Sequence, residues 1–213
     1  MVMKIEWRSA RVRSVRNLTA DIRLFELETS GTFVAPTPGS NINVSVLIHG
    51  RPTVRNYSCV GPCTDGRYRI AVKLLPTSRG GSRYMWTLEP GANLTISAPE
   101  NHFELSRGRP EYLLLAGGIG ITPIYSMALA LQKAEANFRV LYACRRRQDL
   151  ARSVEWRNVI GDRLETVNDD DGKRIDLDGE VTQLAPGGEL YVCGPLGMLG
   201  SSGSAMGCSR TPT

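Results

Sequence analysis

The chain has few histidines and lysines, no Cys-x-x-Cys pair and an odd number of cysteines. Its two His residues belong to none of the usual zinc motifs. Cys59 and Cys63 are spaced unlike the cysteine run of plant-type iron–sulfur proteins, so we expect no metal site and no iron–sulfur cluster in this chain. The odd count of five cysteines also argues against a disulfide framework.

Membrane and secretion signals are lacking as well. No run of about 18 apolar residues occurs, which excludes a membrane-spanning helix. The segment Met1–Trp7 is charged early and lacks the apolar core of a signal peptide. We therefore predict a cytoplasmic protein that makes no membrane contact.

The net charge of +5 raises the question of a nucleic-acid partner. Only four of the 26 basic residues are lysines, and the arginines are scattered apart from the run Arg145–Arg147. This distribution argues against nucleic-acid binding. A basic surface would also suit an acidic redox partner or an anionic cofactor.

Residues 1–106 show alternating hydrophobicity. The runs Ile42–Ile48, Tyr68–Leu74 and Leu94–Ala98 place apolar residues at every second position, and Gly/Pro/Asp turns separate them. This pattern is typical of antiparallel strands around one core. We predict an N-terminal antiparallel β-barrel domain with one short helix in the segment "GGSRYMWTL".

Beyond a polar hinge at 106–110, residues 110–199 follow a different pattern. The segments "EYLLLA", "FRVLYAC" and "ELYVCG" are continuously apolar, as strands covered on both faces are, and helical patterns lie between them. Alternating strands and helices predict a C-terminal α/β domain with a parallel sheet.

Residues 200–213 are rich in Gly and Ser, which oppose a helix. We predict a disordered or aberrant tail, because a helix is expected after Met198 to cover the sheet. A truncated or frameshifted chain would explain it; a natural end with a flexible tail is the alternative.

In an open parallel sheet, ligands bind beyond the carboxyl ends of the strands. Four loops leave those ends: Gly117–Thr122, Cys144–Arg147, Asn168–Asp171 and Cys193–Gly197. The first is similar to a dinucleotide-binding loop, with Pro123 in place of the third glycine. Such glycines also occur where a strand and a helix merely pack closely. No acidic residue closes the second strand, as the NAD fingerprint would require.

The barrel carries two further segments, "RNYS" at 55–58 and "RGGS" at 79–82. An arginine and a helix start with bare glycine amides can bind phosphate, and a tyrosine offers a flat aromatic face. The alternative is an ordinary surface strand with a half-buried tyrosine.

In their order and spacing, "RNYS", "RGGS", "AGGIGITP" and "YVCGP" resemble the ferredoxin–NADP reductase superfamily. The likeness is greatest to the phthalate dioxygenase reductase branch, which includes the vanillate demethylase reductases, and it covers residues 5–199. It implies an NAD(P)H-dependent flavin reductase that passes electrons to an external ferredoxin or oxygenase component. Members of this branch continue into a C-terminal [2Fe–2S] ferredoxin domain, which this sequence lacks.

The resemblance also implies roles for residues. Arg55 would bind the flavin phosphate together with the Gly80–Ser82 segment, and Tyr57 would pack on the isoalloxazine. Ser58 near flavin N5, Thr122 near the junction of flavin and nicotinamide, and Cys193 beside the nicotinamide are the candidate catalytic residues. The full set of implied cofactor-binding residues is Arg55, Asn56, Tyr57, Ser58, Val72, Lys73, Gly80, Gly81, Ser82, Gly117, Gly118, Gly120, Thr122, Cys193, Gly194 and Pro195.

The cofactors are expected to be FMN and NADH. The Gly-Gly-Ser helix start favours FMN over FAD, and the branch favours NADH, although the run Arg145–Arg147 could accept the 2′-phosphate of NADPH. Two other functions stay open: a non-catalytic flavin-binding remnant, and a nucleotide-binding regulatory module without flavin. The sequence does not determine an oligomeric state.

Overall fold

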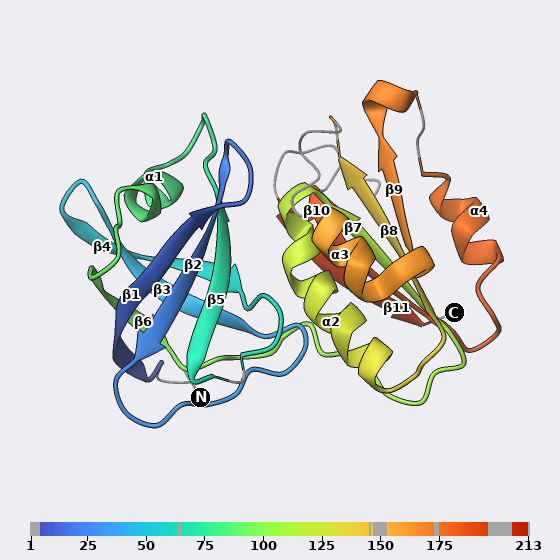
Figure 1. The fold of residues 1–213 in the computed structure, drawn as a ribbon, viewed down its shortest axis with the longest axis horizontal. Coiled ribbons are helices and arrows are strands. Elements are labelled where there is room, and N and C mark those ends of the chain that lie inside the picture. The colour runs from blue at the N-terminus through green and yellow to red at the C-terminus, as the bar shows by residue number, and fades with distance from the viewer. Residues whose placement is uncertain are drawn as a thin grey trace. The chain divides into compact units, whose positions relative to one another are not determined.

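The computed structural model describes residues 5–63, 65–144, 146, 153–172, 175–195 and 206–212. The chain divides into two units, Met1–His102 and Phe103–Thr213, each with its own hydrophobic core (Figure 1). The predicted hinge segment is tied to the second unit, where the backbone N–H of Ser106 donates to the Tyr191 hydroxyl at 2.7 Å. The Tyr112 hydroxyl donates to the carbonyl of Ser106 at 3.2 Å.

The first unit is a six-stranded antiparallel sheet in the order β4-β3-β6-β1-β2-β5. An antiparallel bridge between Cys59 and Ile70 joins the end of β4 to β5, so the sheet curls into a barrel. The predicted antiparallel barrel with one short helix is confirmed. Its elements are β1 (Trp7–Asn17), β2 (Ile22–Thr29), β3 (Asn41–Ile48), β4 (Arg51–Ser58), β5 (Arg67–Lys73), α1 (Gly81–Trp86) and β6 (Asn93–Ser97).

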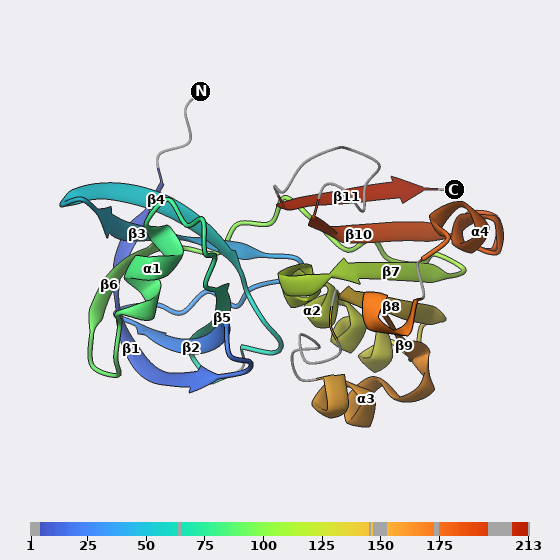
Figure 2. The same cartoon turned by 90° about the horizontal axis from the view of Figure 1, so that it is seen from above.

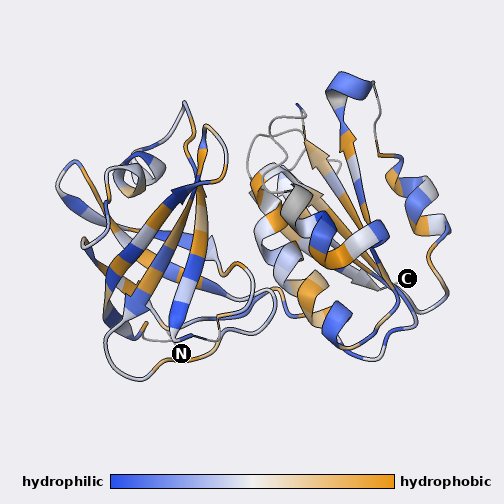
Figure 3. Ribbon diagram, viewed as in Figure 1, coloured by the Kyte–Doolittle hydropathy of each residue, from blue (hydrophilic) through white to orange (hydrophobic). Residues whose placement is uncertain are grey.

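Alternation along the strands builds the barrel core. Ile42, Val44 and Val46 on β3 are completely buried, while the residues between them are half-buried or exposed. Figure 3 shows the same alternation of hydrophobic and hydrophilic residues along the strands of the first unit. Side chains of successive strand residues point to opposite faces, which is why this pattern predicts strands with one face on a core.

The second unit contains a five-stranded sheet in the order β11-β10-β7-β8-β9 (Figure 2). Helices α2 and α3 pack on one face through the cluster that contains Leu114 and Trp156, and α4 packs on the other through Leu177 and Val181. Its elements are β7 (Tyr112–Gly117), η1 (Gly118–Gly120), α2 (Ile121–Lys133), β8 (Phe138–Cys144), α3 (Ser153–Ile160), η3 (Gly161–Arg163), β9 (Leu164–Asn168), η4 (Asp169–Asp171), α4 (Leu177–Thr182), β10 (Glu189–Pro195) and β11 (Met206–Pro212).

Strands β10, β7, β8 and β9 are parallel, which confirms the predicted α/β domain. The sheet as a whole is mixed, however, because β11 pairs antiparallel with β10 from Glu189 opposite Pro212 to Pro195 opposite Met206. The edge strand β11 thus adds an antiparallel pair to the predicted parallel sheet.

The structure also differs from the predicted tail over Met206–Pro212, which form β11 rather than a disordered segment. Residues 200–205 lie outside the described part of the chain. Glycine and serine oppose a helix, but an edge strand needs only backbone N–H and C=O groups to pair with β10.

The prediction about disulfides is also corrected. Cys193 of β10 and Cys208 of β11 form a disulfide, although the odd cysteine count argued against a disulfide framework. An odd count excludes complete pairing but not a single bond. Of the helices in the described part of the chain, none is long and apolar enough to cross a membrane.

Candidate functional site

Arg55 lies against the first residue of α1. A Cβ atom added to Gly81 would be 2.6 Å from Nε of Arg55, so a larger residue there would displace this side chain. The other end of the guanidinium donates from Nη1 to the carbonyl of Val54 at 2.8 Å. Within the described residues, no carboxylate forms an ion pair with Arg55, so its charge is available to an anion.

The start of α1 has an unusual cap. Gly80 has φ of 102°, a left-handed conformation that favours glycine, and no side chain caps the helix among the residues that the structure describes. The first backbone N–H groups of a helix lack partners within that helix and attract anions. We call Arg55, Tyr57, Gly80, Gly81 and Ser82 the Arg55 cluster.

Ser82 and Ser78 shape the loop before α1. The Ser82 hydroxyl donates to Oγ of Ser78 at 2.8 Å and accepts from the backbone N–H of Leu75 at 3.4 Å. The backbone N–H of Gly80 donates to the same Ser78 oxygen at 3.2 Å. Ser78 was not among the predicted site residues, although a serine two residues before a glycine is a common turn signal.

Tyr57 lies on the same face of β4 as Arg55, since the two residues pair with Ile42 and Val44 of β3. Its ring packs against the barrel core. Burial raises the pKa of Tyr57 to about 12, although the charge of Arg55 acts in the opposite direction. The side chain is therefore a neutral phenol at physiological pH, as an aromatic packing surface should be.

Four other predicted residues do not join the Arg55 cluster. The Asn56 amide donates to Asn41 and Asn43 at 2.6 and 3.2 Å, on the opposite face of β4. The Lys73 ammonium pairs with Asp21 at 3.2 Å. Val72 is in the core, and its carbonyl accepts from Nε1 of Trp86 at 3.2 Å. Ser58 is half-buried at the end of β4.

In the second unit, the loop Gly117–Thr122 joins β7 to α2, and we call it the glycine loop. Gly118 has φ of 52°, and a Cβ atom added there would meet nothing within 4 Å. The backbone at Gly118 is thus open on the side where a side chain would project. Thr122 is buried, and its hydroxyl donates to the carbonyl of Ile119 at 3.0 Å.

Gly120 has a different role. A Cβ atom added to it would overlap the carbonyl of Cys193 and lie 2.9 Å from the backbone nitrogen of Gly194. The glycine loop therefore packs directly against the carboxyl end of β10. Of the two interpretations of these glycines, close packing rather than ligand approach agrees with the structure at Gly120.

At the end of β10, Cys193 and Gly194 are buried and Pro195 is exposed. Sγ of Cys193 is bonded to Cys208, so the predicted catalytic position carries no free thiol in this structure. Sequence analysis missed Cys208, because the predicted tail gave it no place in the fold.

The other loops at this sheet edge contribute less. Arg146 is exposed, and Arg145 and Arg147 lie outside the described residues. Asn168 and Asp171 bond to each other, with Nδ2 of Asn168 donating to the carboxylate at 2.8 Å. Among the described residues, no three His, Cys, Asp or Glu side chains gather as a metal site would require.

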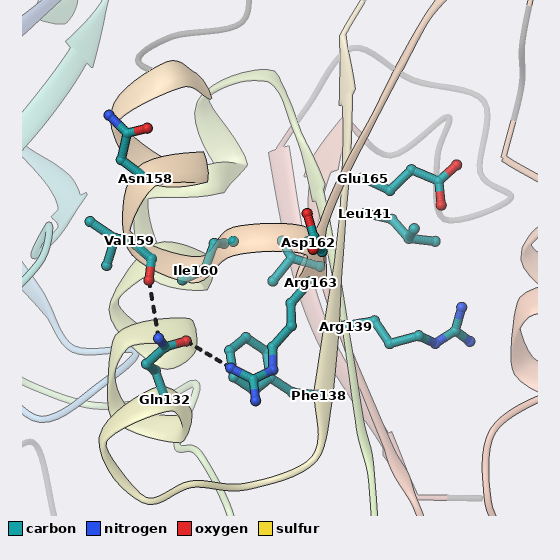
Figure 4. Close-up of a pocket in the computed structure, with 12 residues that line it drawn as sticks. Gln132, Phe138, Arg139, Leu141, Asn158, Val159, Ile160, Asp162, Arg163 and Glu165 are labelled. Carbon is teal, nitrogen blue, oxygen red and sulfur yellow. Dashed lines mark hydrogen bonds between the residues drawn. The ribbon is translucent and has the colours of Figure 1, made fainter.

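A cavity of about 630 Å³ lies elsewhere on the second unit (Figure 4). The amide of Gln132 joins its walls, donating to the carbonyl of Val159 and accepting from Arg163, both at 3.1 Å. The lining residues Phe138 and Glu165 belong to the amino-terminal parts of β8 and β9, at the opposite end from the glycine loop. The cavity is therefore separate from the predicted nucleotide site.

Comparison with known proteins gives a consistent family. Residues 114–202 match the model described as oxidoreductase NAD-binding domain. The tetrachlorobenzoquinone reductase of Sphingobium chlorophenolicum is 37% identical over 197 residues, which are 88% of this chain and 60% of that protein. The vanillate O-demethylase oxidoreductase of Pseudomonas sp. strain HR199 is 35% identical over 195 residues, 89% of this chain and 61% of that protein.

A solved structure of phthalate dioxygenase reductase superimposes with a TM-score of 0.79 at 30% identity, covering 91% of this chain and 62% of that chain. That protein is described as modular, for electron transfer from pyridine nucleotides to [2Fe–2S]. The chain thus spans about three-fifths of the length of these relatives.

Proposed function

From the membership of this chain in the ferredoxin–NADP reductase superfamily, in the branch of the phthalate dioxygenase and vanillate demethylase reductases, we propose that it is an NADH-dependent FMN reductase. It would take hydride from NADH onto FMN and pass electrons to an external ferredoxin or oxygenase component. The observation that carries the proposal is the Arg55 side chain lying against Gly81 without a carboxylate partner among the described residues.

The Arg55 cluster fits a phosphorylated flavin. The guanidinium and the uncapped start of α1 place a cation and backbone donors together, as phosphate binding requires. Neutral, half-buried Tyr57 lies on the same side of β4 and would pack against an aromatic ring. Because these donors suit a terminal phosphate, we propose FMN rather than FAD. Ser58 would border the flavin from the end of β4.

The glycine loop fits the pyrophosphate of a dinucleotide. The open side of Gly118 allows close approach to the backbone, and α2 begins directly behind it without a side-chain cap in the described part of the chain. Gly117 and Thr122 would border the same ligand, with Cys193, Gly194 and Pro195 beside them on β10. We propose NADH as the physiological donor, and NADPH as the alternative.

When bound, a flavin accepts hydride from a reduced nicotinamide and can release electrons singly. This reaction needs no protein acid or base, so the residues of both sites act by binding and orientation. Arg55 would bind the negatively charged phosphate, and Tyr57 would exclude water from one face of the flavin ring. Gly120 packs closely on β10 and so fixes the position of the glycine loop.

Reduction of ferricyanide, a one-electron acceptor, tests this function without the physiological partner. NADH should reduce ferricyanide in the presence of the chain and FMN, and FAD should support a lower rate. Activity equal to that of free FMN with NADH would contradict the proposal.

A further inference from the structure

The pair Cys193–Cys208 links two neighbouring strands of the second sheet. The two residues lie directly opposite each other on antiparallel β10 and β11, fifteen residues apart in sequence, and they form a disulfide. Cys193 is only 4% exposed, whereas Cys208 is exposed. A small oxidant or reductant can therefore reach the bond from the side of Cys208.

The other cysteines are poor candidates for the same chemistry. Cys59 and Cys63 are buried in the barrel core, and burial raises the pKa of both thiols. The thiolate is the reactive form, so these two react slowly. Cys144 is half-buried, and its thiol donates to the carbonyl of Arg146 at 2.9 Å.

Strand β11 is an edge strand of the sheet and pairs with β10 from Glu189 opposite Pro212 to Pro195 opposite Met206 (Figure 2). None of its described side chains is buried, so it adds little apolar packing. Two residues after Cys208 on β11, Arg210 pairs with the fully buried carboxylate of Glu189, and Arg109 lies 3.3 Å from the same carboxylate. The disulfide and this ion pair therefore link β11 to β10 in addition to the backbone pairing of the two strands.

The β10 side of the disulfide touches the glycine loop. Gly120 packs against the carbonyl of Cys193 so closely that no Cβ atom fits between them. A change in the position of Cys193 must be transmitted to Gly120, since protein interiors leave no space to absorb it.

We propose that Cys193 and Cys208 form a reversible redox site whose state determines how firmly β11 and the glycine loop are held. Oxidation by a peroxide removes the two thiol hydrogens and forms the S–S bond, while the peroxide is reduced to two waters (for an organic hydroperoxide, one water and one alcohol). A dithiol reductant returns both thiols and is itself oxidised to a disulfide. Such reversible bonds are the kind that occurs in reducing compartments.

The redox reaction is tested by counting thiols in the purified full chain. After full reduction, removal of the reductant and treatment with hydrogen peroxide, wild type should lose two alkylatable thiols per chain. Mass spectrometry should then identify a peptide pair joined through Cys193 and Cys208. Cys208→Ser should form no such link, and the control Cys144→Ser should behave as wild type. A chain that keeps all its thiols, or forms only links between chains, would overturn the proposal.

The structural consequence is tested by amide hydrogen exchange on wild type alone, in its oxidised and reduced forms, so that no variant needs to fold. Reduction should speed exchange about tenfold or more in residues 206–212, and measurably at Gly117–Thr122, while β1 and β2 are unchanged. Equal exchange in both forms would overturn the proposal. The readout needs no nucleotide or flavin, so it is independent of the proposed function.

Discussion

Arg55 joins two segments that are distant in sequence and that together make the proposed anion site. Its side chain lies against Gly81, where a Cβ atom would crowd it, whereas Gly80 is favoured by its φ of 102°. The motif segments predicted this proximity only through the family resemblance. The ion pair of Lys73 with Asp21 could not be predicted, because it depends on how the loop before β2 returns to the barrel.

Replacement of Arg55 by alanine should weaken FMN binding about tenfold or more, since a hydrogen bond to a charged group contributes about 1.5–3 kcal/mol. Titration of FMN fluorescence measures the affinity. Arg51→Ala is the matched control, because Arg51 is an exposed arginine on the same strand. Equal FMN affinity in the two variants would refute the phosphate assignment.

Tyr57 predicts a pH dependence of stability. Its pKa is raised to about 12 in the folded chain from an ordinary value of 10, so the folded state holds its proton more tightly than the unfolded state. This contribution is fully present below pH 10 and is lost as the pH rises towards 12. In urea unfolding, the stability lost between pH 9 and pH 11 should be about 1 kcal/mol smaller in Tyr57→Phe than in wild type. An identical loss in both proteins would contradict the assignment.

At the scale of elements, the strands with a clear period were predicted correctly. The alternation over Ile42–Ile48 predicts a strand with one buried face. The continuous apolar run at Leu113–Leu115 predicts a strand with both faces buried. Strand β11 could not be predicted in this way, because none of its described side chains is buried and its pairing depends on the free edge of β10. The disulfide could not be predicted either, because it depends on the register that places Cys208 opposite Cys193.

The two glycines of the loop between β7 and α2 should respond differently to alanine. In Gly120→Ala, the added Cβ atom would push the backbone of Cys193 and Gly194 away from the glycine loop. This substitution should therefore lower the melting temperature clearly. Gly118→Ala meets open space and costs only the left-handed strain, about 1–2 kcal/mol. It should weaken NADH binding several-fold while FMN affinity stays unchanged. Thermal unfolding and NADH titration separate the two effects; a loss of FMN binding in Gly118→Ala would contradict the assignment of the glycine loop.

At the scale of the whole molecule, we assign one proposed binding site to each unit. The barrel carries the Arg55 cluster, and the α/β unit carries the glycine loop at the carboxyl edge of its parallel strands. Hydride transfer requires a ligand at each of these proposed sites, so the proposed reaction depends on both units. Loss of either site should abolish NADH-dependent chemistry while the other site still binds its ligand.

Anaerobic mixing of the FMN-loaded chain with NADH tests this central claim most directly. The visible absorption of bound flavin should disappear in a single turnover, with a rate that saturates as the NADH concentration rises. A chain that binds FMN but keeps its visible absorption with excess NADH would be a non-catalytic flavin-binding remnant. A chain that binds NADH and no flavin at all would be a nucleotide-binding module, and either result would contradict the account.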